Sequence, residues 1–287
     1  MKRQFVDIAE GQVHVRRAGQ GGLPLLLLHV APGTAAGLDP LTEGLGRTRA
    51  CYALDCLGMG DSSPPAVAAP DLAYFADATR RTVDALGLSQ YCVYGNRGGA
   101  HMAIELAITD PSVQSIVIDG LWHFPWPKEL PWTNPYPAPT VEELHDHYAP
   151  ALTLDAFGSQ FRQAWHLMRD SWLFWPSYAR QGAHRRTTSV PEAAILHDQV
   201  VELLKGARTQ HLGVRAAFRH DWRARAALVR RPTLALGNAC PFIPGAIKKT
   251  SPRFDNYAAN AKALEANVAE IAAFLDGGAA PSGAKVA

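Results

Sequence analysis

Apolar positions change their spacing twice along the chain, and the two changes divide it into three parts. Up to Gly120, short and nearly continuous apolar runs alternate with helical stretches. Such runs are typical of parallel strands that are buried on both faces of a sheet. The alternation stops at Gly120 and resumes at Pro232. The runs that predict buried strands are residues 25–28, 50–54, 91–94, 115–118 and 233–236, and the helical stretches around them are 72–86, 99–109 and 258–275.

The alternation of strand and helix predicts an α/β fold with a mostly parallel central sheet and helices on both faces. At the start of the chain, residues 5–8 and 12–17 alternate apolar and polar positions around Glu10 and Gly11, which predicts an antiparallel hairpin. Between Gly120 and Pro232 the pattern is helical instead, over residues 141–147, 152–170, 191–205 and 211–229. We therefore predict an α/β core of residues 1–120 and 232–276, an inserted helical cap at 121–231 over the carboxyl edge of the sheet, and a disordered tail at 277–287.

The length and composition agree with one domain that carries a large insertion. The chain has 287 residues, of which 47% are hydrophobic and 19% are charged. A length nearly twice that of a common domain of about 150 residues has to be explained. All seven Trp lie between Trp122 and Trp222, and eight of the eleven His lie between His123 and His220. The predicted cap is therefore composed differently from the parts that flank it.

Charge and cysteine spacing narrow the classes of partner. The formal net charge is +2, and residues 121–231 hold 14 Lys and Arg against 10 Asp and Glu. Neither value indicates a nucleic acid or a membrane as the partner, so we expect a small-molecule substrate and leave an oligomer open. The four Cys show no Cys-x-x-Cys spacing, and no apolar stretch has the length of a signal peptide or a membrane span. We expect a cytoplasmic protein without a metal or another cofactor.

Three motifs follow one another in a recognisable order. They are His29-Val-Ala-Pro-Gly33 after the first buried run, Asp55-Cys-Leu-Gly-Met-Gly-Asp-Ser62, and Gly95-Asn-Arg97-Gly-Gly99 between a strand and a helix. This series resembles the α/β-hydrolase fold superfamily, in which the motifs are His-Gly-x-Pro-Gly, Asp-x-x-Gly-x-Gly-x-Ser and Gly-x-Ser-x-Gly. The resemblance extends over the chain except for the interior of the cap. It implies an α/β-hydrolase-like sheet with helices on both faces.

The resemblance also shows where this chain departs from the family. Arg97 stands at the position of the nucleophilic serine, and no Ser occurs between positions 89 and 112. Cys240 stands at the position of the acid, and residues 222–254 contain no Asp or Glu. Tyr257 stands near the position of the base, and no His follows position 220. Because a guanidinium keeps its charge, it can act neither as nucleophile nor as base. We therefore expect a divergent member without the Ser-Asp/Glu-His triad.

The sequence offers candidates for a site without the triad, with residues for anion binding, an oxyanion hole, proton transfer and the substrate pocket. Arg97 would lie at the amino end of a helix, where an anion is favoured, and we expect it to bind a carboxylate or a phosphate. The alternative is an ion pair between Arg97 and Asp119 in an inactive site. The resemblance implies an oxyanion hole formed by the backbone N–H groups of Ala31 and Gly98. Tyr257, His123 or Asp119 would move a proton, and the residues expected to line the substrate pocket are Trp122, Trp126 and Cys240.

Three functions are compatible with such a site. The main expectation is an enzyme with lyase, isomerase or cyclase chemistry, including decarboxylation, on an apolar or aromatic substrate whose anionic group is held by Arg97. The second is hydrolysis by a water that His123 or Asp119 activates, without a covalent intermediate. The third is a binding protein without catalytic activity. The fold by itself does not distinguish among them.

Overall fold

The structure is a computed structural model that describes residues 1–121, 140–143, 147, 151–237, 243–249 and 261–277. Within these residues, eight strands form one sheet in the order β1-β2-β4-β3-β5-β6-β7-β8. The strands are β1 Lys2–Ile8, β2 Gly11–Ala18, β3 Leu25–Leu28, β4 Cys51–Leu54, β5 Tyr91–Asn96, β6 Val113–Asp119, β7 Thr233–Leu236 and β8 Ile247–Lys249. β1 pairs with β2 and β2 with β4 in antiparallel fashion, whereas the other neighbours are parallel. The predicted fold class is confirmed.

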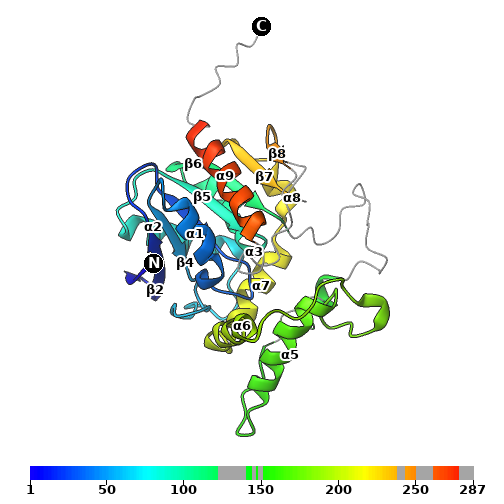
Figure 1. Ribbon diagram of the computed structural model, residues 1–287. Coiled ribbons are helices and arrows are strands. Elements are labelled where there is room, and N and C mark those ends of the chain that lie inside the picture. The colour runs from blue at the N-terminus through cyan, green and yellow to red at the C-terminus, as the bar shows by residue number, and fades with distance from the viewer. Residues whose placement is uncertain (122–139, 144–146, 148–150, 238–242, 250–260, 278–287) are drawn as a thin grey trace.

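Helices cover both faces of the sheet (Figure 1). The apolar side chains of β3 alternate between the two faces, with Leu25 and Leu27 in one hydrophobic cluster and Leu26 and Leu28 in the other. This alternation follows from the period of two in a strand, and it explains why the whole run is apolar. The first cluster is covered by the 3₁₀ turn η1 Ala35–Leu38 and the helices α1 Asp39–Leu45 and α9 Ala261–Gly277. The second is covered by α2 Leu72–Ala85, α3 Gly98–Thr109, α7 Gln210–Arg219 and α8 Trp222–Ala226.

The strand order places a functional site at one particular edge. After β3 the chain continues to β4 on one side, and it later returns to β5 on the other side of β3. In open α/β sheets, such a reversal opens a crevice beyond the carboxyl ends of the two strands, and ligands bind there. The residues that follow β3 and β5 therefore lie where a ligand is expected.

The helices of the predicted cap pack in two different ways. α5 Ser159–Leu173 and α6 Ala193–Lys205 pack against each other around a small cluster of their own, formed by Leu152, Ala164, Leu203 and Ala207. In Figure 1, α5 extends away from the sheet. By contrast, α7 and α8 contribute Val214, Phe218, Trp222 and other residues to the cluster that also holds α2 and α3. The shorter elements of this part are α4 Val141–Glu143 and the 3₁₀ turn η3 Gly182–His184. The division at residues 121 and 231 stays a prediction.

Local turn chemistry explains where the helices differ from the predicted ones. The stretch predicted as one helix over 211–229 is two helices, because Asp221 interrupts it and its side chain accepts a hydrogen bond from the N–H of Ala224 at 3.3 Å. The helix predicted from position 152 begins at Ser159, since Asp155 binds the N–H groups of Phe157 and Ser159 in a preceding turn. η1, α1 and β8 were not predicted. The predicted tail lies outside the described residues from position 278 onward.

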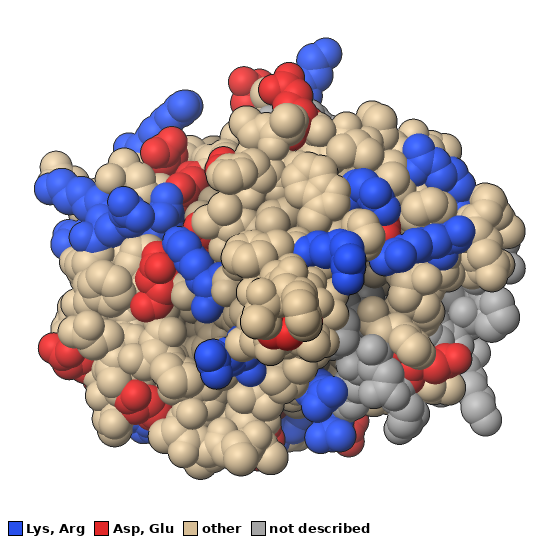
Figure 2. Space-filling view, turned by 90° about the horizontal axis from the view of Figure 1, so that it is seen from below, with Lys and Arg blue, Asp and Glu red and all other residues tan. Residues whose placement is uncertain are grey.

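The described surface is mixed in charge. Figure 2 shows Lys and Arg in separate groups among uncharged side chains, with Asp and Glu between them, on the face seen from below. On this face the basic residues do not join into one continuous patch. Among the described helices, none has both the length and the apolar character needed to cross a membrane.

Candidate functional site

Arg97 forms a sharp turn between β5 and α3. Its backbone has φ 48° and ψ −101°, and among the described residues it is the one non-glycine residue with a positive φ. The backbone N–H of Arg97 donates to the carbonyl oxygen of Asp119 at 3.2 Å, and the carbonyl oxygen of Arg97 accepts from the N–H of Ala100 at 3.0 Å. Such a strained turn is the feature that presents a side chain at the top of the sheet in this type of fold. The side chain of Arg97 is half-buried.

Two glycines make this turn possible. A Cβ atom on Gly95 would lie 2.4 Å from the carbonyl oxygen of Gly99, and a Cβ atom on Gly99 would lie 2.3 Å from the carbonyl oxygen of Leu28. Both distances are far below a van der Waals contact, and both neighbours are backbone atoms that cannot rotate away. The two glycines therefore allow α3 to begin directly over β3. Position 97, midway between the two glycines, is therefore the elbow position whatever side chain it carries.

Asp119 lies beside the elbow at the end of β6. Its side chain is 6% exposed, and its Oδ2 accepts a hydrogen bond from the hydroxyl of Tyr94 at 2.5 Å. The Nδ2 of Asn96 donates to the backbone oxygen of Asp119 at 3.1 Å. Because residues 94 and 96 of β5 point to the same face of the sheet, they hold both the side chain and the backbone of Asp119. We did not identify Tyr94 or Asn96 from the sequence, although the alternation along this strand could have indicated them.

The loop that follows β3 lies against the start of α3. Ala31 is buried, and it lines a cavity of about 10 Å³ together with Gly98 and Gly99. This volume is about the room that one water molecule needs. The other residues that line the cavity are His29, Cys56, Met59, Leu72, Phe75, Met102 and Gly213. The two residues predicted to form an oxyanion hole are thus adjacent.

His29 supports this loop through both of its ring nitrogens. Its Nδ1 lies 2.8 Å from the carbonyl oxygen of Val30, and its Nε2 accepts a hydrogen bond from the N–H of Cys56 at 3.1 Å. A ring whose Nε2 accepts a hydrogen bond carries its single proton on Nδ1, which donates to Val30. Both nitrogens are therefore occupied in joining the loop after β3 to the turn after β4. The geometry favours a structural role for His29 over proton transfer to a ligand.

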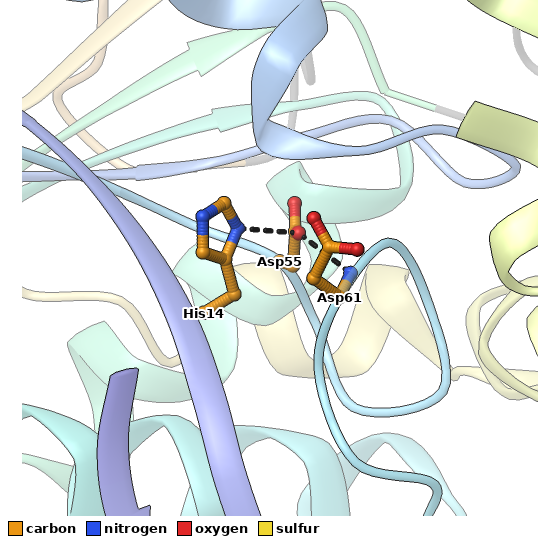
Figure 3. Close-up of side chains that lie close together, drawn as sticks. All are labelled: His14, Asp55 and Asp61. Atoms are coloured by element: carbon orange, nitrogen blue, oxygen red, sulfur yellow. Dashed lines mark hydrogen bonds and ion pairs between the residues drawn. The ribbon is translucent and has the colours of Figure 1, made fainter. Parts of the chain in front are cut away.

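His14, Asp55 and Asp61 form a group of potential metal ligands whose ligand atoms lie within 4.8 Å of one another (Figure 3). Asp55 is 2% exposed, and its Oδ2 lies 2.8 Å from Nδ1 of His14. The backbone N–H groups of Ala35 and Asp61 donate to Asp55 at 2.7 and 3.0 Å. Burial would raise the pKa of Asp55, but these hydrogen bonds outweigh it and the pKa lies below its usual range.

The carboxylate of Asp61 is occupied as well, since it forms an ion pair with the ammonium of Lys205 at 3.0 Å. Each acidic group of the cluster therefore has partners within the protein. Asp55 joins β2, the first residue of η1 and the turn after β4, as expected for a loop-shaping residue. This arrangement supports a structural role rather than a metal centre.

The structure describes four of the predicted site residues. Arg97 and Asp119 lie side by side at the ends of β5 and β6, and Ala31 and Gly98 line one cavity. The contact that the structure shows between Arg97 and Asp119 is a backbone hydrogen bond. The other predicted residues, Trp122, His123, Trp126, Cys240 and Tyr257, lie outside the described residues.

Comparisons with known proteins place this geometry in a family. Residues 24–194 match the model of the alpha/beta hydrolase fold. The chain is 30% identical over 129 residues to a 2-hydroxy-6-oxononadienedioate/2-hydroxy-6-oxononatrienedioate hydrolase of Paraburkholderia xenovorans, which covers 41% of this chain and 44% of that protein. It is 33% identical over 129 residues to an N-formylmaleamate deformylase of Pseudomonas putida, covering 42% of this chain and 47% of that protein. The chain thus matches less than half the length of these curated relatives.

Solved structures agree in fold. An epoxide hydrolase from an endophytic Streptomyces has a TM-score of 0.68 at 18% identity, covering 96% of this chain and 95% of that chain. The enol-lactonase of Burkholderia xenovorans LB400 has a TM-score of 0.62 at 14% identity, covering 95% of this chain and 100% of that chain. At such identities the likeness concerns the fold alone.

The relatives correct one expectation from the sequence. Lyase, isomerase or cyclase chemistry, with decarboxylation included, was expected because the elbow carries Arg97. The named curated relatives are hydrolases and a deformylase, so the expectation of a non-hydrolytic reaction is wrong. That expectation relied on the departure from the triad at all three positions, Arg97, Cys240 and Tyr257, and gave too little weight to hydrolysis by water. The family model spans more than half of the chain, and the motif residues lie in the geometry that the family requires. The chain belongs to the alpha/beta hydrolase fold family.

Proposed function

We propose that this protein hydrolyses a small acidic molecule, that Arg97 binds a carboxylate of the substrate, and that a water molecule is the nucleophile. The observation that carries the proposal is the backbone of Arg97, whose φ of 48° gives it the elbow conformation in which the family presents a reactive side chain. A positively charged guanidinium in that place can orient an anion with two parallel hydrogen bonds. It cannot form the covalent intermediate of a serine hydrolase.

The names of the curated relatives support both parts of the proposal. They are hydrolases or deformylases, and their names refer to a nonadienedioate, a 2-hydroxymuconate semialdehyde and an N-formylmaleamate. These are small acids or derivatives of acids. A cation at the elbow and an acidic substrate are complementary in charge.

The surroundings of the elbow suggest how water could attack. The oxygen of the water would add to the substrate carbonyl, and its proton would pass to Asp119, the buried carboxylate beside Arg97. The backbone N–H groups of Ala31 and Gly98 would stabilise the negative charge on the carbonyl oxygen. The leaving group would then take the proton from Asp119 as its bond to the carbonyl carbon breaks. His123 is the other candidate for the base.

The cap completes the proposed site. Residues 121–231 would cover the carboxyl edge of the sheet and exclude bulk water from the reaction. Trp122, Trp126 and Cys240 would contact the apolar body of the substrate, and Tyr257 would face the reacting group. No cofactor takes part in this scheme.

The experiment that tests the proposal uses a panel of small acids that contain an ester, a lactone, a formamide or a carbon–carbon bond beside a ketone. Turnover should persist after treatment with a fluorophosphonate, and intact-mass measurements during turnover should detect no acyl-enzyme. In water enriched in ¹⁸O, a single turnover should label the acid product. Fluorophosphonate inhibition together with a covalent adduct would overturn the water mechanism, and a complete lack of turnover with retained carboxylate binding would overturn hydrolysis.

Variants at position 97 test whether the Arg97 side chain binds the substrate. Arg97→Met should lower kcat/KM by about 100-fold or more, because it removes a charge-assisted bidentate contact. Arg97→Lys, which keeps the charge and loses the planar geometry, should fall between Met and the wild type. Arg162→Met on the exposed surface of α5 is the matched control and should leave turnover unchanged. Equal activity of Arg97→Met and the wild type would exclude Arg97 from the site.

A further inference from the structure

A chain of contacts joins two histidines and an ion pair where α7 and α8 pack on α3. Arg225 donates to both carboxylate oxygens of Glu105, with Nε to Oε1 and Nη2 to Oε2 each at 2.7 Å. Nε2 of His220 lies 2.7 Å from the same Oε1, and Nδ1 of His220 lies 2.9 Å from Nδ1 of His101. His101 is fully buried, and Glu105 is 5% exposed. The proposed mechanism uses none of these four side chains.

The partners of Glu105 determine where the first proton lies. Burial would raise the pKa of Glu105, but the hydrogen bonds from His220 and Arg225 lower it to about 2. The carboxylate is therefore ionised at neutral pH and accepts hydrogen bonds without donating any. It follows that Nε2 of His220 carries a proton.

The second contact then permits two arrangements. In a neutral His220 the Nδ1 atom has no proton, so it accepts the proton that His101 carries on Nδ1. When His220 gains a proton on Nδ1, His101 has to present an unprotonated Nδ1, and its own proton moves to Nε2. If both rings were charged, two N–H groups would face each other at 2.9 Å. The pair can therefore take up one proton, which arrives on Nε2 of His101, while the proton between the two Nδ1 atoms lies on one ring or the other.

We infer that Glu105, His220 and His101 are positioning residues for the first turn of α3, and that the single proton shared by the two histidines adjusts the placement of the Gly98 N–H group. His101 lies three residues after Gly98 and four after Arg97, within the opening turns of the same helix. His220 lies in the connection between α7 and α8, and it contacts Glu105 and His101 of α3 directly. The inference rests on the proposed function only in giving Gly98 an oxyanion role.

Other charges on the packed elements define the field around the pair. Glu105 on α3 and Arg225 on α8 belong to the contact chain itself. Among the described residues, elements that pack near α3 carry further charged or titratable groups: Arg97 and Asp119 at the elbow, Asp77, Arg80, Arg81 and Asp84 on α2, His211, Arg215 and Arg219 on α7, and Asp221 and Arg223 at the start of α8.

The first experiment needs no variant. Nuclear magnetic resonance of the ¹⁵N-labelled full chain reports the tautomer of each histidine ring between pH 8 and pH 5. At pH 8 we expect His220 protonated on Nε2 and His101 protonated on Nδ1. On acidification, one proton should be taken up by the pair, with Nε2 of His101 becoming protonated at the same midpoint. Two independent titrations, each to a fully charged ring, would overturn the inference.

The second experiment connects the proton to α3. The amide ¹H–¹⁵N signal of Gly98 in the ligand-free protein should shift with the midpoint of the histidine pair. His220→Gln should remove this step, and Glu105→Gln should move it to lower pH by at least one unit. Glu105→Asp, which keeps a carboxylate, should restore the step in part, whereas a merely structural glutamate would give no such rescue. His197→Gln on the exposed face of α6 is the control and should leave the step in place.

These readouts separate the inference from the proposed function. The tautomers and the Gly98 signal are measured without substrate, so they are informative even if the protein hydrolyses nothing. A Gly98 amide that does not respond while the histidines titrate would overturn the positioning role. Loss of hydrolysis in Arg97→Met concerns the proposed function alone.

Discussion

The backbone N–H of Arg97 donates to the carbonyl oxygen of Asp119 at 3.2 Å, and this contact joins the elbow after β5 to the end of β6. Both atoms belong to the main chain. This hydrogen bond therefore does not depend on the side chain at position 97. The strain in the turn is also independent of that side chain unless the residue is glycine.

Substitution of Arg97 by glycine should stabilise the fold while it abolishes binding. A non-glycine residue at φ 48° in a sparsely populated region costs about 1–3 kcal/mol, and glycine adopts this conformation without that cost. Glycine also loses more backbone entropy on folding, which offsets part of the gain. We expect the free energy of unfolding to rise by about 1 kcal/mol in urea titrations, and carboxylate binding to be lost in calorimetry. A less stable Arg97→Gly protein would show that the Arg97 side chain stabilises the turn.

Substitution of Gly99 by alanine should destabilise the protein strongly. The added Cβ would lie 2.3 Å from the carbonyl oxygen of Leu28, and both β3 and α3 would have to move apart. We expect the free energy of unfolding to fall by about 2–4 kcal/mol. Gly37→Ala is the matched control, because no atom lies within 4 Å of the added Cβ there. A loss of the same size in both variants would show that the close approach to Leu28 is not its cause.

The stability that Glu105 provides should depend on pH in a defined direction. Its pKa in the folded protein is about 2, below the value of 4.5 for an unperturbed glutamate, so its contribution is complete above about pH 4.5 and is lost as the pH falls toward 2. The shift corresponds to roughly 3 kcal/mol at neutral pH. The difference in unfolding free energy between wild type and Glu105→Gln should therefore shrink as the pH falls from about 4.5 toward 2. A difference that grows within this range would contradict the assignment.

The cluster at Asp55 should respond to mutation and not to metal ions. Asp55→Asn removes a charge that accepts from His14, Ala35 and Asp61 in a buried place, and we expect a loss of about 2–4 kcal/mol in unfolding free energy. Binding of a metal ion to the folded state would raise Tm. Because we expect no such binding, micromolar Zn²⁺ or a chelator should leave Tm of the wild type unchanged. A Tm that rises with the Zn²⁺ concentration and loses this dependence in Asp55→Asn would establish a metal site.

Sequence reasoning succeeded where one short segment determines the result. The run Leu25–Leu28 is buried at every position, and Gly95 and Gly99 flank the elbow as the motif required. It failed where a single side chain binds the backbone in place of the helical hydrogen bonds. Asp221 does this between α7 and α8, where it accepts from the N–H of Ala224. The edge strand β8 has little apolar signal, because it consists of Ile247 and two lysines.

Contacts between distant parts of the chain could not be predicted. Glu105 and His220 are 115 residues apart, and their pairing follows from the packing of α7 and α8 on α3 rather than from any local pattern. The same is true of Tyr94 and Asp119, which meet because β5 and β6 are neighbours in register. A sequence alone indicates that such polar residues need partners when buried, but not which partners they find.

The close approach of α3 to β3 has a consequence for how the protein can diversify. Gly95 and Gly99 leave no room for a Cβ atom, whereas Arg97 is half-buried and its backbone N–H makes the hydrogen bond to the end of β6. A library randomised at positions 95, 97 and 99 and selected for folding alone should return glycine at the two outer positions and many residue types at the central one. New chemistry at this elbow is therefore accessible by a single codon change, without a compensating mutation elsewhere.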